Sequence, residues 1–135
     1  MRKNGTPRVL LVEDEADVAR YLAAALEDEG YEVVTACDAE EGLAAARSFR
    51  PDLISLDLVM PGRTGLTLYR EVREDPDLGA IPIVVVSGVN PADAAEKLGL
   101  GDSLAAPDAF IEKPVELPLF LTTIGELLAG ARRSP

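Results

Sequence analysis

The sequence contains no histidine, and its only cysteine is Cys37. Without histidine the chain cannot build a Ser-His-Asp triad, a Cys-His pair or most catalytic zinc sites. A single cysteine has no partner for a disulfide within the chain, which favours a reducing, cytoplasmic compartment. These two absences exclude the commonest hydrolytic and zinc-dependent chemistries.

Basic residues are scarce as well. The chain has 13 lysine and arginine residues against 24 aspartate and glutamate residues, for a net charge of −11. Because neutralising a phosphate backbone requires clustered lysine and arginine, we expect no direct binding to nucleic acid. The sequence also lacks the roughly 18 consecutive apolar residues of a membrane span. Its polar start leads straight into a predicted strand, so we expect no signal peptide. We therefore expect no association with a membrane.

The sequence does contain enough apolar material for one globular domain. It is 135 residues long, 47% hydrophobic and 27% charged, which suits a single domain with an ordinary hydrophobic core. We assign that domain to residues 8–129, and we expect residues 1–7 and 130–135 to be flexible ends or a linker.

Short apolar runs alternate with amphipathic segments along this domain. The runs predict five strands, at residues 8–12, 31–35, 53–58, 81–87 and 109–112. Helices are expected between them, including a short one at residues 91–98, and after the last strand. The apolar stripes expected to face the core are Val18, Tyr21, Leu22, Ala25 and Leu26 in the first helix, and Phe120, Leu121, Ile124, Leu127 and Leu128 in the last. This pattern predicts an α/β fold, a doubly wound parallel sheet with helices on both faces.

Polar side chains stand where four of these strands end. Glu13 and Asp14 follow the first strand, and Asp57 interrupts the end of the third. Ser87 ends the fourth strand, and Lys113 follows the fifth. Each alone has an ordinary explanation, such as a helix cap or a surface lysine. Because the carboxyl ends of parallel strands meet at one edge of the sheet, however, we expect all five to converge.

This convergence has a chemical consequence. A carboxylate in a buried strand, such as Asp57, is unfavourable unless something neutralises it. Clustered carboxylates suit a magnesium ion, and a lysine with a hydroxyl suits phosphate oxygens. A carboxylate that attacks phosphorus forms an acyl phosphate, and this reaction needs charge stabilisation rather than a general base. The strand ends therefore predict a phosphoryl-aspartate site.

A series of motifs at these positions resembles a known family. The motifs are Val-Glu-Asp-Glu at 12–15, Asp-Leu-Val-Met-Pro-Gly-x-x-Gly at 57–65, Ser87-Gly88, and Phe-Ile-Glu-Lys-Pro at 110–114. Together they resemble the receiver domain of two-component response regulators, from about residue 8 to residue 128. The resemblance implies the flavodoxin-like strand order 2-1-3-4-5.

The resemblance also implies a role for each site residue. Asp57 would accept a phosphoryl group from a phosphohistidine of a sensor histidine kinase or phosphotransfer protein. Mg²⁺ would be held by the side chains of Glu13, Asp14 and Asp57 and by the backbone carbonyl of Val59.

Ser87 and Lys113 would contact the phosphoryl group. Ser87 and Phe110 would form the switch, with Phe110 turning inward as the Ser87 hydroxyl is drawn to the phosphate. The bond before Pro114 would be cis.

The function implied is a signalling switch and not an enzyme, because the domain would catalyse only its own phosphorylation and slow dephosphorylation. Phosphorylation would change the surface formed by residues 91–98, 109–112 and 118–128. That surface would control an unknown downstream effector and could also mediate a homodimer. The segment 99–107 is longer than is usual in the family and carries two glycines and a proline, so the output face should differ from that of other members.

Three alternatives stay open. A phosphatase of the haloacid-dehalogenase type also uses a strand-end aspartate, but it needs a second acid two residues later, where this chain has Val59. A pseudo-receiver that is never phosphorylated is disfavoured because all the site positions are filled. The chain could also be either a stand-alone receiver or a piece of a larger regulator or hybrid kinase.

The sequence also predicts a long lifetime for the acyl phosphate. Val59 and Val89, two residues after Asp57 and Ser87, are both apolar. Because neither side chain can orient an attacking water, we expect slow dephosphorylation. Loss of label from the purified phosphorylated domain measures the rate, and a half-life of seconds would contradict this expectation.

Overall fold

The computed structural model describes residues 5–58, 65–88 and 107–133. The elements in chain order are β1 (Arg8–Val12), α1 (Ala16–Asp28), β2 (Glu32–Ala36), α2 (Ala39–Phe49), β3 (Leu53–Asp57), α3 (Gly65–Glu74), β4 (Ile83–Ser87), β5 (Ala109–Glu112) and α5 (Leu117–Arg133). The helix expected at residues 91–98 lies outside the described residues. No helix in the described part of the chain is long and apolar enough to cross a membrane.

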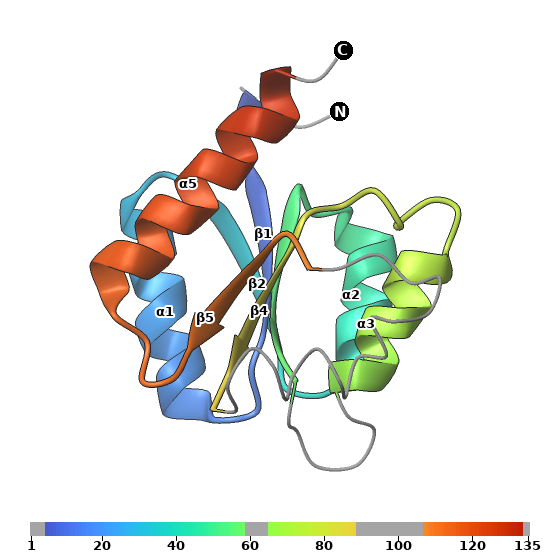
Figure 1. Ribbon diagram of the computed structural model, residues 1–135, viewed down its shortest axis with the longest axis horizontal. Coiled ribbons are helices and arrows are strands. Elements are labelled where there is room, and N and C mark those ends of the chain that lie inside the picture. The colour runs from blue at the N-terminus through green and yellow to red at the C-terminus, as the bar shows by residue number, and fades with distance from the viewer. Residues whose placement is uncertain (1–4, 59–64, 89–106, 134–135) are drawn as a thin grey trace.

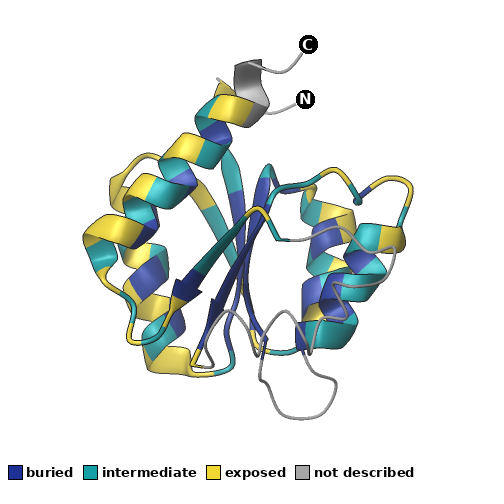
Figure 2. Cartoon of the chain, viewed as in Figure 1, coloured by how far each residue is buried: buried dark blue, intermediate teal, exposed yellow. Residues whose placement is uncertain are grey.

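The strands form one parallel sheet in the order β2-β1-β3-β4-β5. This confirms the predicted fold class and strand order. Helices α1 and α5 cover one face of the sheet, and α2 and α3 cover the other (Figure 1). The central strands β1, β3 and β4 are almost entirely buried (Figure 2). Burial on both faces explains why these strands are uninterrupted apolar runs and not alternating ones.

Alternate residues of each central strand enter two separate cores. In β1, Leu10 and Val12 pack toward α2 and α3, whereas Val9 and Leu11 pack toward α1 and α5. Side chains on a strand point to opposite faces in turn, so each strand supplies both cores. Apolar packing thus covers both faces of the sheet. The ends of the strands remain available for polar groups.

One expectation about the outer helices needs correction. Tyr21 was expected in the core, yet it is 58% exposed, while its neighbour Leu22 is 1% exposed. The buried residues of α1 are Ala19, Leu22 and Leu26; their stripe is narrower than expected, and Tyr21 lies beside it at about 100° around the helix from Leu22. Helix α5 continues to Arg133, into the segment that we expect to be a flexible end or a linker. The stripe expected in α5 centres on Phe120, Ile124 and Leu128, all buried.

At the opposite edge of the sheet from the strand-end carboxylates, Arg73 of α3 holds several segments together. Its guanidinium donates to the backbone carbonyls of Gly79 at 3.2 Å and Ile81 at 3.0 Å. It also pairs with the carboxylate of Asp108 at 2.9 Å, just before β5 begins. The same Asp108 oxygen accepts the amide of Ile83 at 2.8 Å, at the start of β4. One side chain, only 7% exposed, therefore ties α3 to the starts of β4 and β5.

Replacement of this arginine should destabilise the fold. We expect Arg73→Ala to lower the free energy of unfolding by about 2–3 kcal/mol, because it removes the cation paired with Asp108 and the donor to two backbone carbonyls. Urea denaturation followed by circular dichroism measures the loss. Arg20→Ala is the matched control, since Arg20 is 75% exposed and, within the described residues, its ion pair is with exposed Asp17 on its own helix; it should change stability by less than about 0.5 kcal/mol. Equal losses in the two variants would contradict this role.

Candidate functional site

The carboxyl-terminal edge of the sheet brings the strand-end residues together. β1 and β3 are neighbours in the sheet, so Glu13 and Asp14, which follow β1, lie beside Asp57, the last residue of β3. One carboxylate oxygen from each of these three residues lies within 4.8 Å of the other two. Convergence of the acids follows directly from the parallel order of the strands.

Lys113 reaches into this group of acids from the loop after β5. Its Nζ lies 3.1 Å from Asp57 Oδ2 and 3.1 Å from Glu13 Oε1. Both carboxylates are almost fully buried, with Glu13 at 3% and Asp57 at 4% exposure. Buried charges are tolerated only when they are paired, and this lysine is the pairing cation that the structure shows for both acids.

Backbone hydrogen bonds fix the positions of these side chains. The amide of Lys113 donates to the carbonyl of Ser87 at 2.8 Å, which joins the ends of β5 and β4. The amide of Glu13 donates to the carbonyl of Ala36 at 2.9 Å, and a carboxylate oxygen of Glu13 accepts the amide of Glu15 at 3.2 Å. The Lys113–Pro114 peptide bond is cis. The site is therefore built on strand ends and their hydrogen-bonded continuations.

The electrostatics of the site are unbalanced in favour of negative charge. Burial raises the pKa of Glu13, and the nearby charge of Asp57 raises it further, while the Glu15 amide and Lys113 act in the opposite direction. Burial alone would lower the pKa of Lys113, but its hydrogen bonds and attraction to Asp57 and Glu13 outweigh burial and raise it. Lys113 therefore keeps its charge at neutral pH. Because the pKa of Glu13 is raised in the folded state, ionisation of Glu13 lowers the stability of the fold as the pH rises through that pKa.

A divalent cation fits this donor set. Hard cations such as Mg²⁺ prefer carboxylate oxygens, and the three acids exceed the single positive charge of Lys113. Asp14 is half-buried, and with Glu13 it lines a groove of about 720 Å³ along α1 that opens to solvent. An ion held at half-buried Asp14 would keep part of its water shell.

The remaining predicted residues lie nearby or outside the described part of the chain. Ser87 ends β4 and is fully buried. Phe110, in β5, is half-buried and packs against the core on the α2 and α3 side. Val59, whose carbonyl was expected to bind the metal, lies outside the described residues.

Two residues near the site were not identified from the sequence. Glu15 extends a carboxylate to 3.7 Å from Lys113 Nζ, although its side chain is largely exposed. Gly65 begins α3 directly against the backbone of Asp57. For both residues the sequence contained a signal, because Gly65 is the last residue of the motif at 57–65 and Glu15 is the last residue of the motif at 12–15.

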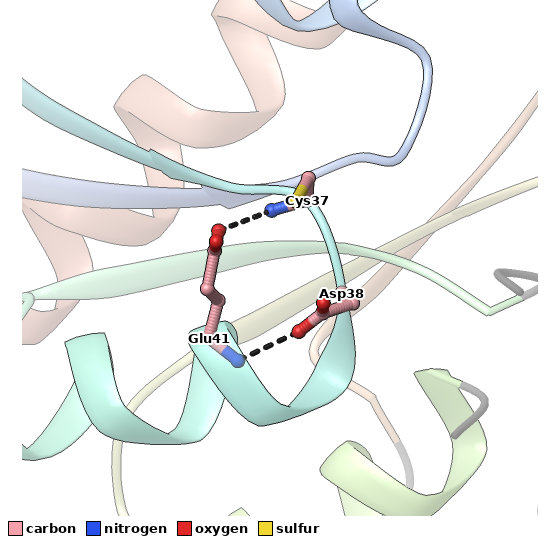
Figure 3. Close-up of side chains that lie close together, drawn as sticks. All are labelled: Cys37, Asp38 and Glu41. Atoms are coloured by element: carbon pink, nitrogen blue, oxygen red, sulfur yellow. Dashed lines mark hydrogen bonds between the residues drawn. The ribbon is translucent and has the colours of Figure 1, made fainter. Parts of the chain in front are cut away.

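A second group of possible ligands, Cys37, Asp38 and Glu41, has a structural explanation. Asp38 caps α2 by accepting the amide of Glu41 at 2.8 Å (Figure 3). The Glu41 carboxylate in turn accepts the amide of Cys37 at 2.9 Å. A hydrogen bond with Glu41 raises the pKa of the Cys37 thiol, which makes it less reactive. These side chains serve the start of the helix.

Comparison with known proteins agrees with this geometry. The chain is 34% identical over 123 residues to Protein PilH of Pseudomonas aeruginosa, covering 91% of this chain and 98% of PilH. It is 31% identical over 123 residues to the polar-differentiation response regulator DivK of Brucella anthropi, covering 91% and 97% of the two chains. The response regulator PleD of Caulobacter vibrioides is 35% identical over 113 residues, which cover 81% of this chain and 23% of PleD.

Solved structures show the same fold. The signal receiver domain of a signal transduction histidine kinase from Syntrophus aciditrophicus superimposes with a TM-score of 0.84 at 30% identity, covering 96% of each chain. A CheY-like receiver domain protein from Methanospirillum hungatei gives 0.84 at 28% identity, covering 96% and 98%. Residues 9–124 match the response regulator receiver domain family. The chain therefore belongs to the response regulator receiver domain family of two-component signalling.

Proposed function

We propose that this domain, residues 8–129, is a phosphoacceptor switch that takes a phosphoryl group onto Asp57. The observation that carries the proposal is the buried Asp57 carboxylate, held 3.1 Å from Lys113 Nζ and grouped with Glu13 and Asp14. The donor would be the phosphohistidine of a histidine kinase or phosphotransfer protein. Family membership supports a partner of this kind, and the geometry supports the identity of the acceptor.

The proposed reaction is a direct transfer between two side chains. One oxygen of Asp57 forms a bond to phosphorus while the phosphorus–nitrogen bond of phosphohistidine breaks, and the electron pair of that bond returns to the imidazole. Lys113 is placed to neutralise the negative charge that spreads over the phosphoryl oxygens. The Ser87 hydroxyl, at the adjoining strand end, would donate to one of these oxygens. No general base is needed, because Asp57 attacks as a carboxylate.

Glu13, Asp14 and Asp57, with the Val59 carbonyl, are the proposed ligands of Mg²⁺. When bound, this ion would offset the repulsion between the acids and the incoming phosphoryl group. Glu13 is almost fully buried and Asp14 is half-buried, and both line the groove along α1. Lys113 would then exchange part of its pairing with Glu13 for the phosphoryl oxygens.

The proposed output runs through β5 and α5. Lys113 and Ser87 are joined by a backbone hydrogen bond, so a phosphoryl group that draws in both side chains acts on the ends of β4 and β5 together. Half-buried Phe110 of β5 is the proposed switch residue, because it has room to change its burial. The effector, and any homodimer through the same face, would contact β5 and α5, where Leu119 is 53% exposed. We place the switch in the cytoplasm, as the single cysteine suggests.

Phosphorylation of Asp57 can be tested with a small donor. Incubation with acetyl phosphate and Mg²⁺ should add one phosphoryl mass to the wild-type chain and none to Asp57→Asn, because an amide cannot form the acyl phosphate. Intact-mass spectrometry at neutral pH measures the gain. Asp52→Asn is the control, since Asp52 lies at the opposite end of β3 and binds the amide of Arg8. An unmodified wild-type chain would contradict the proposal and favour a pseudo-receiver.

Magnesium binding can be tested separately, through stability. Saturating Mg²⁺ should stabilise the wild type by about 2.7 kcal/mol when the free ion is at 100 times its dissociation constant. Asp14→Asn should remove most of this gain, because it deletes one of the three clustered carboxylates. Asp17→Asn, an exposed acid on the next turn, should keep it. Thermal unfolding with and without Mg²⁺ measures the difference, and an unchanged gain in Asp14→Asn would contradict its assignment as a ligand.

A further inference from the structure

The geometry points to Gly65 as a positioning residue for Asp57. Gly65 is the first residue of α3, and its amide donates to the carbonyl of Leu58 at 3.0 Å. A Cβ at this position would lie 2.0 Å from the carbonyl oxygen of Asp57 and 2.7 Å from Leu58 Cα. Cβ atoms in proteins essentially never approach other heavy atoms within 3.0 Å. The close contact follows from packing alone. Its expected effect on phosphorylation rests on the proposed function.

Backbone freedom does not explain why position 65 is glycine. The glycines with positive φ in the described part of the chain are Gly5 and Gly30, so Gly65 has a conformation that other residues adopt. Glycine is also a poor helix former compared with alanine. The property that position 65 requires is therefore the missing side chain, which lets the helix start in contact with the end of β3.

Neither partner in this contact can easily retreat. Asp57 and Leu56 are paired with Val86 and Val85 in the ladder between β3 and β4. On the other side, α3 is anchored by Leu68, Tyr69 and Val72, which are all within 1% of full burial. A methyl group at position 65 would need about 1 Å of extra space (3.0 − 2.0) from backbone atoms. Because β3 and α3 are both held in place, we expect the backbone at Asp57 to be displaced.

The expected consequence of a side chain at position 65 is a misplaced Asp57 nucleophile. Displacing a reacting group by about 1 Å can slow a reaction roughly 100-fold. We therefore expect Gly65→Ala to slow phosphorylation by acetyl phosphate at least tenfold at saturating Mg²⁺ and donor, and to weaken Mg²⁺ binding, since Asp57 is one of the proposed ligands.

Gly42→Ala is the matched control. Its Cβ would also be crowded, at 2.7 Å from Leu68 Cδ2 and 3.3 Å from Val12 Cγ2. These neighbours are side-chain atoms that can move, and neither belongs to Asp57 or Lys113. Gly42→Ala should lower stability but keep the phosphorylation rate and the Mg²⁺ dissociation constant within twofold of the wild type. A general loss of stability is thereby separated from a positioning effect.

The experiment has two readouts, both on the full chain. The first is the phosphorylation rate from intact-mass spectrometry. The second is the ¹⁵N–¹H spectrum without and with Mg²⁺, in which Gly65→Ala should shift the amides of Asp57 and Leu58 before any ion is added. If this variant does not fold in buffer, all three proteins are measured in trimethylamine N-oxide, which favours compact states.

The outcomes separate this inference from the proposed function. A Gly65→Ala variant that keeps the wild-type rate within twofold, or unshifted Asp57 and Leu58 amides, would overturn the positioning role. A wild type that is never phosphorylated, combined with shifted Asp57 amides in Gly65→Ala, would overturn the proposed function and support the geometry. A loss of rate in Gly42→Ala as large as that in Gly65→Ala would also overturn the positioning role, because stability alone would then explain both.

Discussion

The contact between Lys113 and the two buried carboxylates of Asp57 and Glu13 is the interaction on which the site depends. Without this cation, two acids that are almost fully buried would face each other beside a third, Asp14. A lysine 3.1 Å from each reduces that repulsion but leaves an excess of negative charge. The resting site is therefore stable enough to fold and still short of positive charge. That condition suits it to a divalent cation and then to a phosphoryl group.

The sheet allows this arrangement at little cost in stability. Each participant stands at the end of a parallel strand, where the ladder holds the backbone and apolar packing on both faces holds the ladder. The polar groups lie beyond the last apolar layer, so their charges do not interrupt either core. At the opposite edge, Arg73 and Asp108 tie α3 to the starts of β4 and β5. The rigidity of the site comes from both edges of the same sheet.

The helix α3 links these two edges. Its first residue, Gly65, touches the backbone of Asp57, and its penultimate residue, Arg73, holds the loop before β4 and the residue before β5. Movement at Asp57 is thus resisted by a helix whose far end is fixed to the strand that precedes Lys113. Ser87 and Lys113, joined through backbone at the near edge, complete the frame. Such an arrangement suits a switch. Because the neighbouring elements are closely packed, a displacement at the site is transmitted to them and not taken up locally.

The sequence by itself determined the fold class, because five apolar runs separated by amphipathic segments leave a covered parallel sheet as the plain solution, and parallel strand ends must meet at one edge. The same reasoning predicts Glu13, Asp14, Asp57 and Lys113 as neighbours. Only the tertiary structure decided which groups pair, that Tyr21 lies outside the core, and that α5 continues to Arg133. The distance from Gly65 to Asp57 likewise had to be seen. Periodicity specifies which face of an element is apolar, whereas pairing, exposure and close contact depend on how neighbouring elements pack.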